Sequence, residues 1–112
     1  MTTGGGLVTQ GSISSLTPTN PTTALPAAGN VFQFANNAGL NVDSFSGGVA
    51  GTIYTLLAAA TGTVVLRDDS LASGNIIVNA GANTRTMTAG TKETHMMLFD
   101  GTQYIEVSHS VN

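Results

Sequence analysis

Charged residues are scarce in this chain. Only 8% of its 112 residues are Asp, Glu, Lys or Arg, against about 25% in an average soluble domain. A small monomer normally keeps its surface soluble and its strand edges unpaired by spreading charge over them. With three cations and six carboxylates, most of this surface must consist of Thr, Ser, Asn, Gly and Ala. Such a surface favours close packing between subunits, because few charges have to be desolvated. A neutral, polar monomer is the alternative.

Other absences exclude further classes of protein. The chain has no cysteine, which excludes disulfides, thiol catalysis and Cys-based zinc sites. A net charge of −3 with three scattered cations argues against a nucleic-acid partner. We expect no signal peptide, because no basic segment precedes an apolar run at the start. Every apolar run is far shorter than the roughly 20 residues that span a bilayer, so we expect no membrane partner either.

Residues 1–29 differ in composition from the rest and predict an extended N-terminal arm. They contain the flexible run Gly4-Gly5-Gly6 and all three prolines of the chain, Pro18, Pro21 and Pro26. Proline fixes φ and removes a backbone donor, so at most one short strand is expected here, around residues 7–13. An isolated arm of this kind buries too little apolar surface to offset the entropy of ordering it. We expect it to be held by the domain's own surface, by a sister subunit or by a larger scaffold.

Residues 30–112 have the pattern of a β domain. Short apolar or alternating runs are separated by Gly, Asn and Asp turn signals every eight to twelve residues or so. The predicted strands lie at residues 31–35, 40–45, 52–57, 63–67, 76–78 and 84–88, followed by a hairpin at 94–108. This rhythm predicts an all-β fold, a small antiparallel sandwich or barrel of jelly-roll type. We find no convincing sequence repeat, although two Gly- and Asn-bounded strand pairs have a similar rhythm.

The terminal hairpin is the sharpest structural signal. Its turn is Asp100-Gly101, a pair that accepts the positive φ angles of a tight turn. On the first strand Met97 and Phe99 alternate with Met96 and Leu98, so both faces are apolar and must be covered by the fold or by a neighbouring copy. On the second strand the apolar residues point to one side, and the polar ones, with Tyr104, point to the other. The predicted hairpin and core residues are Met97, Phe99, Asp100, Gly101, Tyr104, Ile105 and Val107.

Candidate chemistry is weak. His95 and His109 lie on the two strands of the hairpin, but no third ligand is spaced to complete a metal site with them. Asp68-Asp69-Ser70 lacks the alternating oxygen ligands of a calcium loop and predicts a turn. No Gly-x-Ser-x-Gly sequence frames a nucleophile, and the six aromatic residues favour core packing over a stacking platform. We expect no cofactor and no enzymatic activity.

Residues 51–109 resemble a small β module that recurs in tailed-bacteriophage virion proteins, including fibres, tailspike-like proteins and head decoration proteins. The matching segments are Gly51-Thr52-Ile53-Tyr54-Thr55-Leu56, Gly62-Thr63-Val64-Val65-Leu66, Ile76-Ile77-Val78, Met97-Leu98-Phe99-Asp100-Gly101-Thr102 and Tyr104-Ile105-Glu106-Val107-Ser108. Tyr104 stands where the module more often carries Trp. The resemblance covers about half the chain and concerns turn and packing motifs, not an active site.

The resemblance implies a homotrimeric capsid decoration, or cement, protein on the virion surface. The β domain would trimerise above a local threefold axis, and the arm would lie across seams of the major capsid protein. The arm residues expected to bind the capsid are Leu7, Val8, Ile13, Leu16, Pro18, Pro21, Leu25 and Pro26. The alternative is a tail-fibre or receptor-binding module that recognises a host glycan, for which Tyr104 and Glu106 form the one aromatic–carboxylate pair in a single strand.

Overall fold

The computed structural model describes residues 13–79 and 83–110, and these fold into short strands and one four-residue helix. The strands are β1 (Ser14–Leu16), β2 (Thr22–Ala24), β3 (Val31–Phe34), β4 (Leu40–Val42), β5 (Ser44–Ser46), β6 (Ile53–Leu57), β7 (Val64–Arg67), β8 (Ile76–Ile77), β9 (Thr84–Met87), β10 (Thr94–Phe99) and β11 (Tyr104–Ser110), and the helix is α1 (Asp69–Ala72). Within the described residues, no helix is long and apolar enough to cross a membrane.

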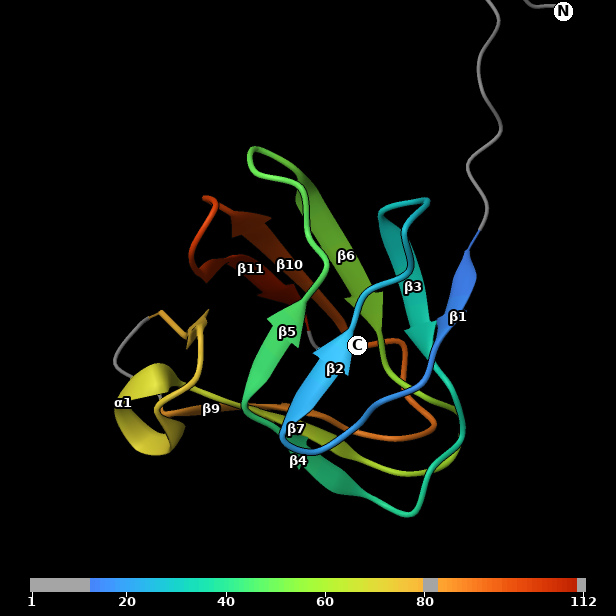
Figure 1. Cartoon of the computed structure of the whole chain (residues 1–112). Helices are drawn as coiled ribbons and strands as arrows, with labels where there is room; N and C mark the ends of the chain where they lie inside the picture. Colours follow the sequence, from blue (N-terminus) through green and yellow to red (C-terminus); the bar gives the residue numbers. More distant parts are fainter. Residues whose placement is uncertain (1–12, 80–82, 111–112) are drawn as a thin grey trace, which may run out of the picture.

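The first half of the chain winds as stacked coils around one core. Strands β1, β3 and β6 lie side by side and parallel, β2 is parallel to β5, and β4 is parallel to β7 (Figure 1). Phe32 is opposite Leu56, and Leu40 is opposite Val64, so the second and third coils are offset by 24 residues on two sides of the stack. The first and second coils are offset by 18 residues between β1 and β3 and by 22 between β2 and β5. Each coil thus places a new strand beside its predecessor, as in a solenoid.

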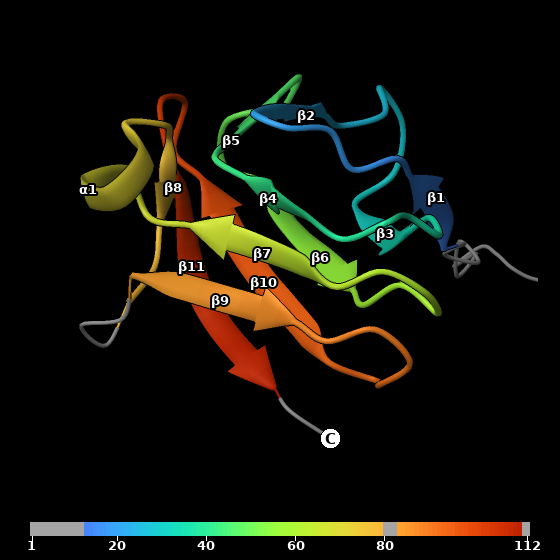
Figure 2. The ribbon, with the colours of Figure 1, turned by 90° about the horizontal axis from the view of Figure 1, so that it is seen from below.

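The second half reverses direction and completes the sheets. Strand β9 runs antiparallel to β7, β10 antiparallel to β6, and β11 antiparallel to β10. The result is a six-stranded sheet in the order β1-β3-β6-β10-β11-β8, which we call sheet A, a pair β2-β5 and a three-stranded sheet β4-β7-β9 (Figure 2). The predicted hairpin turn is confirmed: Gly101 has φ +103° and the Asp100 carboxylate accepts from the N–H groups of Thr102 and Gln103, both at 2.8 Å.

The core lies between sheet A and the two smaller sheets. Apolar side chains at alternate positions of each strand point inward, as the period of two requires. The largest that are fully enclosed include Tyr104, Phe32, Phe34, Phe45, Leu16, Leu56, Leu66, Ile76, Met87 and Met97. The packing prediction for the aromatic residues is confirmed, with Phe99 stacked on Tyr104 at 4.2 Å and Phe32 on Tyr54 at 6.2 Å between ring centroids.

The all-β prediction is confirmed, but the expected architecture is not clearly a sandwich or barrel. Among residues 13–79 and 83–110, five of the eight strand pairings are parallel, whereas a jelly-roll-like antiparallel sandwich would be built from antiparallel pairs. The reason is that a turn signal after a five-residue strand is equally compatible with a hairpin and with the corner of a coil. Turn spacing alone therefore does not determine strand direction.

The expected boundary at residue 29 does not separate an arm from the β domain within the described residues. From residue 13 onward the segment forms the first coil: β1 pairs with β3 and β2 pairs with β5. Leu16 and Leu25 are buried at 2% and 6% exposure. Residues 13–29 are held by the domain's own surface, which is one of the three supports the sequence left open.

Candidate functional site

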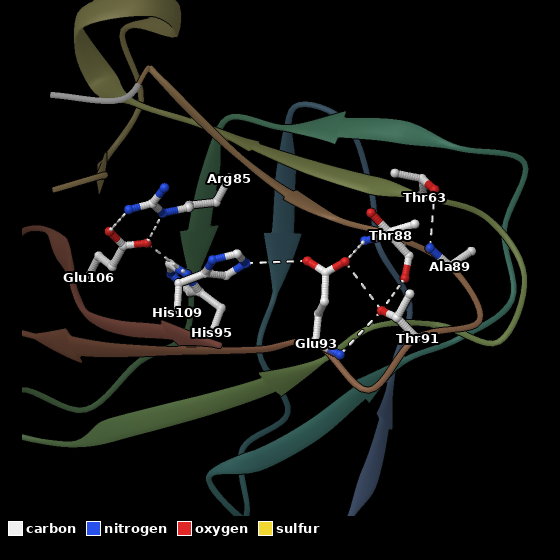
Figure 3. Close-up of polar contacts among 9 residues, drawn as sticks. All are labelled: Thr63, Arg85, Thr88, Ala89, Thr91, Glu93, His95, Glu106 and His109. Atoms are coloured by element: carbon white, nitrogen blue, oxygen red, sulfur yellow. Dashed lines mark hydrogen bonds and ion pairs between the residues drawn. The ribbon is translucent and has the colours of Figure 1, made fainter. Parts of the chain in front are cut away.

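The most concentrated group of ionisable side chains lies inside the fold, where β9, β10 and β11 meet. The carboxylate of Glu106 on β11 accepts two hydrogen bonds from Arg85 of β9. Arg85 Nε lies 2.5 Å from one carboxylate oxygen, and Nη2 lies 3.0 Å from the other. The backbone N–H of Asn79 donates to the same carboxylate at 3.0 Å. His95 of β10 places its Nδ1 3.3 Å from Glu106 Oε2. Figure 3 shows Arg85, His95 and Glu106 converging from separate strands.

A second carboxylate completes this cluster on the other side of the imidazoles. His109 lies opposite His95 in the β10–β11 register, with ring centroids 6.4 Å apart. Its Nε2 lies 3.4 Å from Glu93 Oε2. The other Glu93 oxygen accepts from Thr88 N–H and Thr91 Oγ1, both at 3.3 Å. The two histidines therefore bridge two carboxylates, as Figure 3 shows.

The electrostatics of the cluster favour the ionised form of the Glu106 carboxylate. Burial by itself would raise the pKa of Glu106, but the contacts with His95, Arg85 and Asn79 outweigh it and lower the pKa to about 2. Neither ring nitrogen of His95 has a well-aligned hydrogen bond, although the ring is fully buried. A buried donor or acceptor left in this state is costly.

This cluster connects strands β9, β10 and β11, and most of its polar atoms are buried. His95 is 0% exposed, and Glu93 and Glu106 are each 4% exposed, so no substrate reaches their polar atoms without unfolding. In the described parts of the chain, no group of three or more His, Asp or Glu side chains is arranged to hold a metal ion. The Asp68 segment is likewise structural: its carboxylate accepts from Ser70 and Val78 N–H groups and begins the helix α1.

The predicted hairpin and core residues occupy three kinds of position in the structure: the core, the turn and the outward side of β11. Met97, Phe99 and Tyr104 pack in or against the core, and Asp100 and Gly101 make the turn. Ile105 and Val107 lie in the hairpin but outside the core: Ile105 is only partly buried and Val107 is 52% exposed. The inner face of β11 carries Tyr104 and Glu106 instead, because Gly48 N–H donates to the tyrosine hydroxyl at 2.9 Å and Arg85 neutralises the glutamate.

Most of the described arm residues point inward. Leu16, Pro18 and Leu25 are buried, Pro26 is partly buried, and only Ile13 and Pro21 are exposed. A role for Leu16, Pro18 and Leu25 in binding a capsid is incompatible with this burial, because they pack inside the first coil. Leu7 and Val8 lie outside the described residues.

The glycan pair of the alternative prediction does not form a surface site. Tyr104 is 1% and Glu106 4% exposed, so neither is available to stack on or bind a sugar. The structure instead has a shallow hollow of about 380 Å³ beside β1, lined by Ile13, Ser14, Ser15, Gln33, Phe34, Ala35, Asn36 and Ala60. Its one aromatic residue, Phe34, is 2% exposed and belongs to the core.

Sequence reasoning missed the partners of the buried charges. Arg67 binds Asp43 through two hydrogen bonds of 2.6 and 2.9 Å, and this guanidinium lowers the pKa of the carboxyl. The cation and its carboxylate are 24 residues apart, and the Arg85–Glu106 pair is separated by 21. The only signal available was that charges on predicted strands were few enough to be paired.

No protein-family model matches this chain, and neither a curated protein nor a solved structure is significantly similar to it.

Proposed function

We propose that this chain is a structural virion protein, a bacteriophage capsid decoration (cement) protein that acts as a homotrimer and has no enzymatic step. The observation that carries the proposal is where the few charges lie. Of the nine charged residues, Asp43, Asp68, Glu93 and Glu106 are buried, and only Lys92 and Asp100 are strongly exposed. The solvent-facing surface is therefore even less charged than the composition indicates, and such a surface suits permanent contact with other subunits.

The positions of the ionisable side chains support a binding role over a catalytic one. The ionisable groups that come close together in the described residues are buried or partly buried, as the cluster around Glu106 and the Arg67–Asp43 pair illustrate. The buried Tyr104 and Glu106 remove the pair on which a glycan-binding module depended. The receptor-binding alternative therefore loses the surface site on which it was based.

The protein would stabilise the shell through thermodynamic linkage, because it would bind the assembled shell and not its separate parts. A ligand that binds only the assembled shell stabilises that state by RT ln(1 + [L]/Kd), about 2.7 kcal/mol per site when free ligand exceeds Kd 100-fold. A trimer would repeat each weak contact three times, and the resulting avidity would not need any single strong site. We assign the contact with the major capsid protein to residues 1–12, together with Ile13, which is 60% exposed at the edge of sheet A.

The test is the position of the protein on purified particles. Gold-labelled antibodies raised against the folded chain should decorate the capsid at regular positions and leave the tail unlabelled. Adding the purified protein to expanded shells that lack it should raise their disassembly temperature. Labelling confined to the tail, or shells that neither bind the protein nor gain stability, would contradict the proposal.

A further inference from the structure

The outward side of sheet A has an apolar stripe that crosses four strands. In register, Ile53 of β6 is opposite Leu98 of β10, Leu98 is opposite Ile105 of β11, and Ile105 is opposite Ile77 of β8. Ile53 is 41% exposed, and the other three remain partly exposed. Four apolar residues therefore form one continuous row on a face that retains contact with solvent.

Further apolar residues widen this stripe. Met96, next on the outward side of β10, lies opposite Thr55, and Thr55 lies opposite Val31 of β3. Val107 is the extra residue at the bulge of β11, where Met96 faces Ser108 and Met97 faces Glu106, and it is 52% exposed. We call the outward residues of sheet A the outer face. Its residues are Ser15, Val31, Gln33, Ile53, Thr55, Leu57, Ile77, Thr94, Met96, Leu98, Ile105, Val107, Ser108 and Ser110.

The outer face carries no formal charge. The carboxylate on β11, Glu106, points inward to Arg85, and the sheet's other outward residues are apolar or are Ser, Thr and Gln. The apolar row lies across the end of sheet A next to the Asp100–Gly101 turn and reaches the edge strand β8. Thr94 and Ser110 lie at the opposite end of their strands, and Ser15 and Gln33 lie toward the other edge of the sheet. An apolar patch without charge, flanked by Ser, Thr and Gln, has the composition of a protein–protein contact, in which charged residues are few.

We propose that the outer face is the surface through which copies of this chain associate, so that it meets the same face of other copies. The proposal rests on the homotrimer of the proposed function and assigns its contact surface. Charge favours this occupant: the outer face has no formal charge, so copies of it can meet without burying an unpaired charge. An oppositely charged partner, or an anionic phosphate backbone, would find nothing complementary on it.

The dimensions of sheet A fit three copies around an axis. Five gaps of about 4.8 Å between six strands make the face about 24 Å wide. Three faces of that width would close into a triangular prism with walls about 7 Å from the axis. The side-chain layer of a packed sheet is about 5 Å deep, half the usual sheet-to-sheet spacing, so the side chains would nearly fill the prism. Ile53 and Leu98, on the two central strands β6 and β10, would lie closest to the axis.

The experiment measures association of the full chain by sedimentation and native mass spectrometry over a range of protein concentrations. The disrupting variant is Ile53→Lys, since this side chain is already 41% exposed and the folded monomer should tolerate lysine. The matched control is Leu71→Lys, which adds the same charge at a 50% exposed leucine of α1, off the outer face. A milder variant, Ile53→Thr, keeps a β-branched residue and removes only apolar surface. Circular dichroism and thermal unfolding establish that each variant is folded.

We expect the wild-type chain and Leu71→Lys to form the same oligomer, and Ile53→Lys to weaken association about 100-fold or more, with Ile53→Thr in between. Equal association of Ile53→Lys and the control would overturn the outer face as the interface and leave the homotrimer standing. A wild-type chain that is monomeric at every concentration would overturn both. A wild-type dimer sensitive to Ile53→Lys would support the outer face and contradict the trimeric state.

Discussion

The side-chain amide of Asn75 pairs with the backbone of Phe45 as a neighbouring strand would. Its Oδ1 accepts from Phe45 N–H at 2.9 Å, and its Nδ2 donates to Phe45 C=O at 2.8 Å. Asn75 lies just before β8, and Phe45 is the middle residue of β5. On this side of the stack the third coil does not place a paired strand beside β5, so one side chain satisfies the backbone groups that a strand would otherwise bond.

Replacing Asn75 should therefore destabilise the fold more than its size suggests. Asn75→Ala removes two hydrogen bonds and leaves a partly buried N–H and C=O unpaired, which we expect to lower the free energy of unfolding by about 2–3 kcal/mol. Asn30→Ala is the control, because its Nδ2 makes one exposed bond to Ile53 C=O at 3.2 Å, and it should cost less than about 1 kcal/mol. Urea unfolding measures both, and equal effects would contradict the role of Asn75.

The same corner of the fold requires a glycine at position 74. A Cβ built on Gly74 would lie 1.7 Å from the backbone oxygen of Asp43, so Gly74→Ala forces the third coil away from the second. We expect a loss of more than about 3 kcal/mol or failure to fold. Gly51→Ala is the matched control: Gly51 has φ +86° but nothing within 4 Å of its Cβ position. That change should cost only the strain of a positive φ, about 1 kcal/mol. Thermal unfolding of the two variants distinguishes a steric requirement from a conformational one.

Local signals in the sequence located most of the strands but not their directions. The predicted strands at 31–35, 52–57, 63–67, 76–78 and 84–88 agree within about one residue with β3, β6, β7, β8 and β9. These runs are bounded by Gly, Asn or Asp, which end strands for local reasons. The 24-residue offset between the second and third coils depends on pairings such as Phe32 with Leu56. The sequence has no repeat of residue types from which this offset could be predicted.

The candidate site was predictable only in part, because its decisive contacts are distant in sequence. The hairpin brings His95 opposite His109, as a turn at Asp100-Gly101 requires. Glu106 faces inward because Arg85 is there to pair with it. The alternation of apolar and polar residues alone would place Glu106 on the outward side of β11. The predicted strand at 40–45 is divided at Asp43, which is buried against Arg67. Strands β1 and β2 were missed because a Pro- and Thr-rich segment gives little strand signal by itself.

Two truncations should distinguish the role of the first coil from the role of the residues before it. Deleting residues 1–12 leaves all described strands intact, and we expect the shortened chain to fold with nearly unchanged thermal stability but, on the proposed function, not to bind shells. Deleting residues 1–26 also removes β1, β2, Leu16 and Leu25. Each buried leucine is worth about 2–5 kcal/mol, so this chain should not fold cooperatively. Circular dichroism and thermal unfolding measure both, and a cooperatively folded 27–112 fragment would show that the first coil is dispensable.

The buried carboxylate of Glu106 should make stability depend on acid pH. Its pKa is lowered from 4.5 to about 2 in the folded chain, so the native state binds a proton less readily than the unfolded state. The stabilisation is therefore complete above about pH 4.5 and is lost as pH falls through the range from 4.5 to about 2. A shift of this size corresponds to about 3 kcal/mol. Glu106→Gln should be less stable than the wild type at pH 7, because Arg85 loses its charged partner.

The decisive comparison is the slope of unfolding free energy against pH, measured by urea unfolding from pH 7 to pH 2. Between pH 4.5 and 2 the Glu106→Gln curve should be flatter than that of the wild type, and the two should converge toward the acid end. Asp69→Asn is the control, since its partly exposed carboxylate accepts one hydrogen bond, from Gln103 at 3.1 Å. Parallel curves for Glu106→Gln and the wild type would mean that the acid sensitivity arises elsewhere, with Asp43 against Arg67 the next carboxylate to replace, because its pKa is lowered in the same direction.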